Sequence, residues 1–295
     1  MIETALSEKK PEPSQFDLQE FVRRVLAEDM GSGGDVTSAA TITADARFTA
    51  EMNCREPITV AGLDIAVAFF RALDREVRIS REVNDGDCVA AGTVLARLEG
   101  NARAMLAAER SALNTLQHLS GIATLTRRYV DAIEGTGAVL LDTRKTIPGM
   151  RLLGKYAARM GGAQNHRMRL DDGVLIKDNH VAVAGGVEAA VAAAKAANTS
   201  LQIQCEVDRL EQVEPALAAG ADRLLLDNMK PETLREAVAL VAGRVPLEAS
   251  GGVNLDTIRA LAEAGVDFIS VGRITQSAPA VDIGLDYSLI ELGRS

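Results

Sequence analysis

The second half of the chain alternates short apolar runs with alanine-rich stretches of helical pattern, beginning near residue 137. The apolar runs are AVLLD, GVLIK, LQIQCEV, DRLLLD, VPLEAS and DFISVG, and stretches such as GVEAAVAAAKAAN and PETLREAVALVAG lie between them. The runs are expected to end at Lys177, Glu206, Asp227, Ser250 and Gly272, with the spacing of successive βα units. This rhythm predicts a parallel sheet, either doubly wound or closed into a barrel.

The placement of polar residues distinguishes these two kinds of sheet. In a barrel, reactive groups come from the carboxyl ends of many strands, whereas an open sheet uses one crevice. Nearly every expected strand ends in such a residue: segment 142–145, Lys177, Glu206, Asp227 and Ser250. A lone Asp or Ser there is commonly only a helix cap, but Lys177 and Glu206 directly follow apolar runs, where burial without a partner is costly. The pattern therefore favours a (β/α) barrel.

The pattern before residue 137 predicts a separate α+β unit. FDLQEFVRRVLAED has the apolar stripe of an amphipathic helix. Strands are expected at ARFTAEMNC and EVRISREV, on either side of a helix LDIAVAFFRAL. Two further helical stretches, ARAMLAAERSALNTLQHL and IATLTRRYVDAIEG, lead into the barrel.

Charge is distributed unevenly along the chain. The formal net charge is -9, yet residues 142–180 contain eight Lys or Arg against four Asp or Glu. Nucleic acid is bound by a broadly basic face, which this composition excludes. A local cationic patch on an acidic protein instead predicts a pocket for a small, multiply charged anion.

Targeting patterns and cysteine spacing do not change the predicted class of protein. The stretch MIETALSEKKPEPSQ has neither the apolar core of a signal peptide nor the Arg-rich pattern of a transit peptide. Apolar runs elsewhere are broken by charge before membrane-spanning length, so we expect a cytoplasmic protein without membrane contact. Cys54, Cys88 and Cys205 lack CxxC spacing and predict neither a disulfide framework nor a zinc site.

The cationic candidates suit a planar ligand with two carboxylates. Arg offers a flat, bidentate fork for each carboxylate, and Lys offers a compact charge. The set consists of Arg144, Lys145, His166, Arg167 and Lys177, with Arg110 in ERSALN as an outlying member.

Glu206 and Asp227 form an acidic pair at the same expected mouth. Two carboxylates could hold Mg²⁺ through ordered water, because that ion uses one or two carboxylates together with substrate phosphates. They could also stabilise positive charge developing on a sugar ring. An internal salt bridge to Lys177 or Lys145 is the alternative.

Glycines follow the last two expected strands. SGG, residues 250–252, and GR, residues 272–273, each lie between an apolar run and a helical pattern. Glycine at such a place lets backbone N–H groups approach a phosphate. Ser250, Gly251, Gly252 and Gly272 are therefore candidate phosphate ligands.

Long motifs in this order resemble the quinolinate phosphoribosyltransferase family. They are GSGGDVTS, ERSALNTLQHLSGIATLTRRYVDAI, LDTRKTIPGMRLLGKYAARMGGAQNHRM, LIKDNH, CEV, LLLDNM, EASGGV and ISVGRITQSAPAVDI. The resemblance implies a homodimer and a chain of four parts. These are a polar tail (1–15), an α/β sandwich with a lid helix (16–120), an incompletely closed TIM-like α/β barrel (121–280) and a C-terminal segment returning to the first domain (281–295).

The resemblance also implies an activity. The family transfers phosphoribosyl from phosphoribosyl pyrophosphate to the ring nitrogen of quinolinate, with decarboxylation, in de novo NAD biosynthesis. The products are nicotinate mononucleotide, pyrophosphate and CO₂, and Mg²⁺ is the expected cofactor.

Roles for single residues follow from the same motifs. Quinolinate is expected at Arg144, His166, Arg167, Lys177 and the partner subunit's Arg110. Lys145, Glu206 and Asp227 are the expected catalytic residues facing the phosphoribosyl donor, with Mg²⁺ held by Glu206 and Asp227 through water. Ser250, Gly251, Gly252 and Gly272 are expected at the phosphate.

Three other functions fit parts of the pattern. A Schiff-base aldolase would also place a lysine at a barrel strand end, but in neutral form. A non-catalytic sensor of phosphate ligands would need the cations and have no use for Glu206 and Asp227. A paralogous phosphoribosyltransferase for another aromatic acid would share the barrel and differ in Arg110, Arg144 and Arg167.

Overall fold

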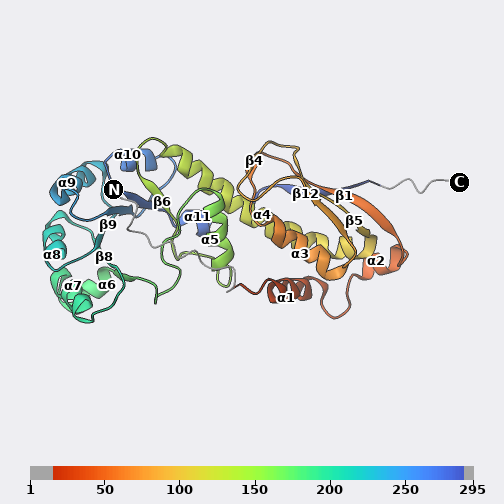
Figure 1. Cartoon of the computed structure of the whole chain (residues 1–295), viewed down its shortest axis with the longest axis horizontal. Helices are drawn as coiled ribbons and strands as arrows, with labels where there is room; N and C mark the ends of the chain where they lie inside the picture. Colours follow the sequence, from red (N-terminus) through yellow and green to blue (C-terminus); the bar gives the residue numbers. More distant parts are fainter. Residues whose placement is uncertain (1–15, 289–295) are drawn as a thin grey trace.

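The computed structural model describes residues 16–288 as two units joined by one long helix, α4 (Figure 1). The expected polar tail, residues 1–15, and residues 289–295 lie outside the described part. No helix among the described residues is both long and apolar enough to cross a membrane.

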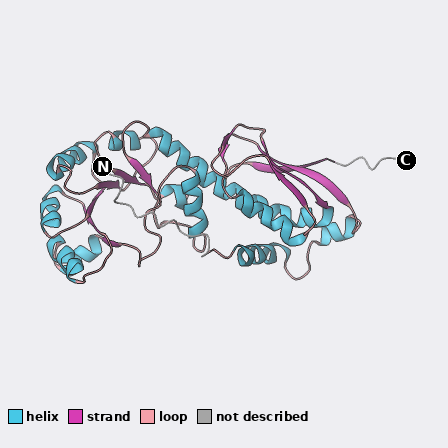
Figure 2. Cartoon of the chain, in the orientation of Figure 1, coloured by secondary structure: helices cyan, strands magenta, loops and turns pink. Residues whose placement is uncertain are grey.

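The N-terminal unit is an antiparallel sheet covered by helices (Figure 2). Its sheet has the order β12-β1-β5-β3, and β2 and β4 form a separate pair. The helices are α1 (Leu18–Met30), α2 (Val36–Thr41) and α3 (Leu63–Leu73), and the strands are β1 (Arg47–Cys54), β2 (Ile58–Thr59), β3 (Arg78–Arg81), β4 (Cys88–Val89), β5 (Val94–Asn101) and β12 (Ile283–Ser288).

Alternating burial explains why this sheet binds its helices on one face. Phe48, Ala50 and Met52 of β1 are buried and share one side of the strand, because side chains alternate along it. Phe69 and Phe70 of α3 are fully buried in the same core. The expected α/β sandwich is confirmed.

The two helical stretches predicted before the barrel form one helix, α4 (Ala102–Ala132). The prediction of a break between them was wrong, and the reason lies at Gly121. A Cβ there would lie 2.1 Å from the backbone oxygen of Pro279, so glycine admits the returning chain against an unbroken helix. The expected domain boundary at residues 120 and 121 therefore lies inside a helix.

The C-terminal unit is a six-stranded parallel sheet of order β6-β11-β10-β9-β8-β7, with helices around its outer face (Figure 2). The strands are β6 (Val139–Leu141), β7 (Val174–Ile176), β8 (Ile203–Val207), β9 (Arg223–Asp227), β10 (Leu247–Ser250) and β11 (Phe268–Ser270). The helices are α5 (Arg151–Met160), α6 (Asp178–Ala184), α7 (Val187–Ala196), the 3-10 helix η2 (Leu210–Gln212), α8 (Val213–Ala218), α9 (Pro231–Val241), α10 (Ile258–Ala262) and α11 (Arg273–Gln276).

The barrel curves without closing. Within residues 16–288, β6 and β7 occupy the two ends of the sheet and do not pair with each other. A single parallel bridge between Leu141 and Gln164 extends the sheet beyond β6. The expected incompletely closed barrel is confirmed.

The chain then returns to the N-terminal unit. β12 pairs antiparallel with β1, with Cys54 opposite Ile283 and Thr49 opposite Ser288. The last described residues thus complete the first sheet.

Candidate active site

All predicted barrel residues lie at one edge of the sheet, where the parallel strands end. Arg144 and Lys145 follow β6, His166 and Arg167 follow the bridge at Gln164, and Lys177 follows β7. Glu206 lies in β8, Asp227 ends β9, Ser250 ends β10, and Gly272 follows β11. Since carboxyl ends of parallel strands share one edge, these side chains gather at a single mouth.

Two arginines at this mouth form no direct ion pair with any carboxylate of residues 16–288. The Nε atom of Arg144 is buried and has no hydrogen-bond partner. Arg167 donates from Nη1 to the carbonyl of Gly173 at 3.1 Å. Burial lowers the pKa of Arg167, and the nearby charge of Arg144 lowers it further. The charge of Asp172 offsets part of this effect. Two partly buried like charges that form no direct ion pair with a carboxylate are still costly, so this arrangement suits an anion.

Lys145 lies beside the second glycine site. A Cβ at Gly272 would lie 2.8 Å from Cδ of Lys145, so glycine is what admits the lysine stem. No carboxylate of the described residues lies within 4.0 Å of its ammonium group. The Lys145 carbonyl accepts a hydrogen bond from Thr275 Oγ1 at 2.8 Å, which fixes the loop that carries this lysine.

His166 has both ring nitrogens in contact with protein. Its Nδ1 accepts from the backbone N–H of Arg167 at 2.8 Å, and its Nε2 lies 3.1 Å from Gln204 Oε1. The Nε2 atom also lies 3.4 Å from Glu248 Oε2. A direct bond to a ligand carboxylate would require one of these contacts to open.

Glu206 forms the salt bridge that the sequence left as an alternative. Lys177 Nζ lies 3.3 Å from Glu206 Oε2, and the carboxylate also accepts from the backbone N–H of Asp178 at 3.4 Å. The glutamate side chain is 11 % exposed and the lysine side chain 49 % exposed. A half-exposed lysine can turn to another anion at modest cost.

Asp227 has no salt bridge to Lys145. It accepts a hydrogen bond from Asn228 Nδ2 at 2.7 Å, and it lies opposite Ser250 in the β9–β10 register. Gly251, with φ +90°, packs so tightly that a Cβ would lie 2.2 Å from Asn228 Oδ1. Glycine is therefore required where the acidic and glycine-rich segments meet.

Arg110 is not part of this mouth within one chain. It is exposed on the first half of α4, whose residues Met105, Ala108 and Ala112 pack into the N-terminal core. The second half of α4, including Leu119 and Tyr129, packs into the barrel core. No hydrogen bond or ion pair joins Arg110 to a barrel residue in the described chain.

Part of the predicted cationic surplus is structural. Lys155 is fully buried against Asp142, and Arg169 pairs with Asp171 at the surface. The cations at the mouth without an acidic partner are therefore fewer than the composition of residues 142–180 indicates.

A buried polar layer beneath the mouth was not predicted. Glu248 accepts from Gln204 Nε2 at 2.8 Å and pairs with Arg223 at 2.7 Å, and Arg223 lies 3.9 Å above the Phe268 ring. A cavity of about 140 Å³ is lined in part by Gln204 and Arg223, together with Asn165, His166 and Arg167.

A larger surface groove, about 840 Å³, lies along α7 and α8 and contains none of the predicted site residues.

The layer also has an electrostatic signature. Burial alone would raise the pKa of Glu248, but His166, Arg223 and the Ser270 hydroxyl outweigh it and lower the pKa to about 2. A signal for this layer exists in the sequence: Gln204 and Glu248 stand two residues before Glu206 and Ser250, hence on the same strand faces.

The carboxylates at the mouth do not form a metal site by themselves. Across residues 16–288, no cluster of three or more His, Cys, Asp or Glu could hold a metal ion. Glu206 and Asp227 on adjacent strands are two hard oxygen donors, which fits an ion that takes its other ligands from water and substrate phosphates.

Comparisons with known proteins agree with this geometry. Residues 35–120 match the N-terminal domain model, and residues 122–286 the C-terminal domain model, of quinolinate phosphoribosyl transferase. The carboxylating nicotinate-nucleotide pyrophosphorylase of Mycobacterium leprae (strain TN) is 43% identical over 281 residues, which cover 92% of this chain and 98% of that protein. The probable enzyme of that name from Bacillus subtilis (strain 168) is 40% identical, covering 94% and 95%.

Solved structures give the same relationship. The nicotinate-nucleotide pyrophosphorylase of Francisella tularensis has 42% identity and a TM-score of 0.88, covering 92% of this chain and 96% of that one. The structure from Ehrlichia chaffeensis has 38% identity and a TM-score of 0.89, covering 93% and 100%. Both domain models and these full-length relatives place the chain in the quinolinate phosphoribosyltransferase family.

Proposed function

We propose that this chain transfers phosphoribosyl from phosphoribosyl pyrophosphate to the ring nitrogen of quinolinate and releases pyrophosphate, CO₂ and nicotinate mononucleotide. The observation that supports this most strongly is the pair Arg144 and Arg167, which lie near each other and form no direct ion pair with a carboxylate of the described residues. A planar diacid supplies the two negative charges that this pair lacks.

Quinolinate binds at the β6 and β7 side of the mouth in this proposal. Arg144 and Arg167 hold its two carboxylates, and Lys177 turns from Glu206 toward the ligand. His166 forms the wall between them and orients Arg167 through its backbone N–H. The ring nitrogen of the ligand then faces the β8 to β10 side.

The phosphoribosyl donor binds along β8 to β11. Lys145 lies against Gly272, which brings its charge close to the loop proposed for the 5-phosphate. Ser250, Gly251 and Gly252 offer a hydroxyl and backbone N–H groups to the same phosphate. Lys145 is the group proposed for the departing pyrophosphate.

Chemistry follows from the charges at the centre. The pyridine nitrogen displaces pyrophosphate from C1 while the ribose ring bears oxocarbenium charge. Glu206 and Asp227, on neighbouring strands, stabilise that charge directly or through the ribose hydroxyls. Once alkylated, the ring nitrogen is cationic, so electrons from the adjacent carboxylate's C–C bond can flow into the ring as CO₂ leaves. A proton then replaces the carboxylate, from Lys145 or from water.

Mg²⁺ is the proposed cofactor. Glu206 and Asp227 would hold it through water while the donor's phosphates supply other ligands, and it would neutralise charge on the leaving pyrophosphate.

Arg110 enters the proposal through a homodimer. Arg110 lies on α4, outside the barrel mouth of its own chain. A homodimer with two-fold symmetry explains this position if Arg110 covers the barrel mouth of the partner subunit. Each chain would then lend Arg110 to the other's quinolinate pocket.

An imine-forming function has less support. Lys177 forms an ion pair with Glu206, and Lys145 is exposed, so neither has the desolvated setting that keeps a nucleophilic lysine neutral.

One assay tests the proposal. Purified protein is incubated with Mg²⁺, phosphoribosyl pyrophosphate and quinolinate carrying ¹⁴C in its 2-carboxylate, and released CO₂ and nicotinate mononucleotide are measured. Equal amounts of both products are expected. Absence of both from folded protein would contradict the proposal.

A further inference from the structure

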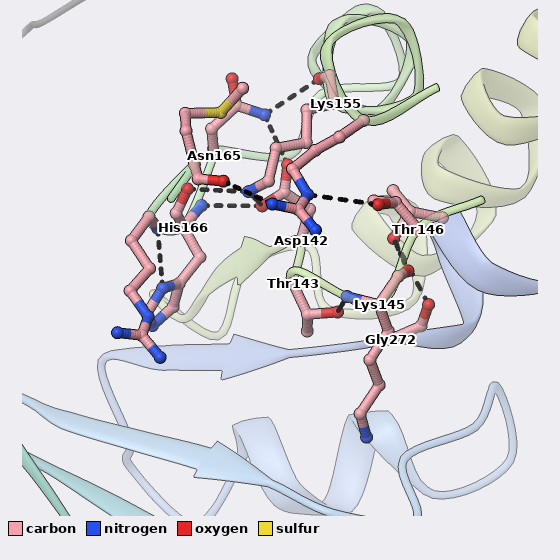
Figure 3. A network of polar contacts seen from close by, with 12 residues as sticks. Asp142, Thr143, Lys145, Thr146, Lys155, Asn165, His166 and Gly272 are labelled. Carbon is pink, nitrogen blue, oxygen red and sulfur yellow. Dashed lines mark hydrogen bonds and ion pairs between the residues drawn. The ribbon is translucent and has the colours of Figure 1, made fainter. Parts of the chain in front are cut away.

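A fully buried ion pair lies directly behind the cationic side of the mouth. Lys155, on α5, donates from Nζ to Asp142 at the end of β6, and both side chains are 0% exposed (Figure 3). Neither is among the residues predicted to bind quinolinate or the phosphoribosyl donor.

The pair holds a neighbouring segment by its peptide groups. Lys155 Nζ donates to the His166 carbonyl at 2.8 Å, while Asp142 Oδ1 accepts from the His166 backbone N–H at 2.8 Å. Asn165 Nδ2 donates to Asp142 Oδ2 at 2.5 Å and to the Lys155 carbonyl at 2.9 Å. Both peptide groups of one residue are thus bound by one ion pair.

These bonds connect the two halves of the cationic set. Asp142 stands two residues before Arg144, and His166 immediately precedes Arg167. The like charges of the two arginines repel each other, which adds to the effect of burial in lowering the pKa of Arg167 and is offset in part by Asp172. A connection that keeps both segments in place must therefore oppose this repulsion while the pocket is empty.

An apolar pair would avoid the cost of burying two charges. Burial raises the pKa of Asp142 and lowers that of Lys155, so desolvation opposes the charged form of each. Replacing a buried ion pair by apolar residues of similar volume is often neutral or stabilising. Apolar side chains, however, could not bind the peptide groups of His166.

We propose that Lys155 and Asp142 are positioning residues for the quinolinate pocket, which fix the Asn165–Arg167 segment against the Arg144 loop. The identity of the ligand in this inference rests on the proposed function. The bracing, by which we mean the hydrogen bonds from Lys155 and Asp142 to the Asn165–Arg167 segment, does not depend on that function. Its effect should fall mainly on quinolinate, because Asp227 and Ser250 lie in β9 and β10, and the backbone of the donor-side Lys145 is held separately by Thr275 Oγ1.

The first test is Lys155→Met, which keeps the stem and removes the ammonium. Lys195→Met is the matched control, since Lys195 forms a surface pair with Asp222 at 2.8 Å in the same barrel. We expect the KM for quinolinate to rise about 10-fold or more in Lys155→Met. The loss of a hydrogen bond to a charged group weakens binding by an amount of this order. The KM for phosphoribosyl pyrophosphate should stay close to the wild-type value, and the control should change neither.

A second variant separates positioning from stability. Lys155→Met alone leaves a buried carboxylate without its partner and lowers Tm, whereas Asp142→Leu with Lys155→Met removes both charges. In the double variant we expect Tm to rise above that of Lys155→Met, because no unpaired charge stays buried, while the KM for quinolinate stays raised. Recovery of both, or an equal rise in both KM values, would overturn the inference.

Hydrogen exchange separates this inference from the proposed function. The His166 amide should exchange faster in both Lys155 variants than in the wild type or the Lys195 control. If wild-type protein lacks the proposed activity but shows this change, the proposed function fails and the bracing stands. Unchanged exchange at His166 would reject the bracing whatever the activity.

Discussion

At the scale of single residues, the proposed function assigns binding and chemistry to side chains of opposite charge. Arg144 and Arg167 are proposed to bind the carboxylates of quinolinate, whereas Glu206 and Asp227 are proposed to supply negative charge to the ribose. The first pair should matter as soon as quinolinate binds. The second should matter most when the ribose is cationic.

Substitutions should reveal this difference. Arg144→Ala should raise the KM for quinolinate roughly 10- to 100-fold with a smaller change in kcat. Glu206→Gln and Asp227→Asn should lower kcat by about 100-fold, more than they raise either KM. Arg235→Ala, at an exposed pair on α9, is the control. If both acidic variants keep the wild-type kcat, the catalytic role of Glu206 and Asp227 is wrong, and Glu206 serves only as the salt-bridge partner of Lys177.

Glu248 should give the fold a distinct acid dependence. Its pKa in the folded chain is about 2, below the usual 4.5, so it stabilises the fold above about pH 4.5. That contribution, on the order of 3 kcal/mol, is lost as pH falls from there toward 2. Tm should therefore drop less between about pH 5 and pH 3 in Glu248→Gln than in wild type. Parallel Tm curves would show that Glu248 is not ionised at low pH.

Residues at strand ends were predictable and buried partners were not. Lys177, Glu206 and Asp227 stand next to apolar runs, so local pattern and the geometry of parallel strands place them together. Lys155 stands in LLGKYAA, where a cation in an apolar stretch signals burial, but its partner Asp142 is found only once α5 packs on β6. The ion-pair partner of Glu248 is Arg223, which lies on another strand, so the local sequence pattern does not reveal this pair either.

At the scale of elements, the apolar runs correspond closely to the strands, while one helix joint was wrongly predicted. The two helical stretches predicted on either side of Ser120 and Gly121 form the single helix α4. The structure uses that glycine for close packing with Pro279, a contact made by residues far apart in sequence.

Two helical glycines should respond in opposite ways. Gly121→Ala should lower Tm clearly, because its Cβ would lie 2.1 Å from Pro279 O. Gly154→Ala, on α5, should leave Tm unchanged or raise it, since its Cβ would meet Ile122 Cδ1 at 3.7 Å and alanine favours a helix by about 1 kcal/mol. Thermal melts of both variants check this, and a loss in Gly154→Ala equal to that in Gly121→Ala would contradict it.

At the scale of the whole molecule, the site is proposed to need two chains. Arg110→Ala and Glu206→Ala proteins, each inactive, are mixed one to one under conditions that allow subunit exchange. Half of the dimers are then mixed, and each contains one barrel with its own Glu206 and the partner's Arg110. About a quarter of wild-type activity should return. Verified exchange without recovered activity would exclude a shared site.

The cations proposed to bind the substrate at the barrel mouth match a diacid, so the rate with each substrate should depend on how many carboxylates it carries. Nicotinate has one carboxylate fewer than quinolinate, so it would leave an arginine or lysine desolvated and unpaired. The measurement is kcat/KM for each acid with phosphoribosyl pyrophosphate and Mg²⁺. We expect quinolinate to be preferred by at least about a hundredfold, since each 1.4 kcal/mol is roughly tenfold. Comparable values for the two acids would contradict the assignment of Arg144 and Arg167 to two carboxylates.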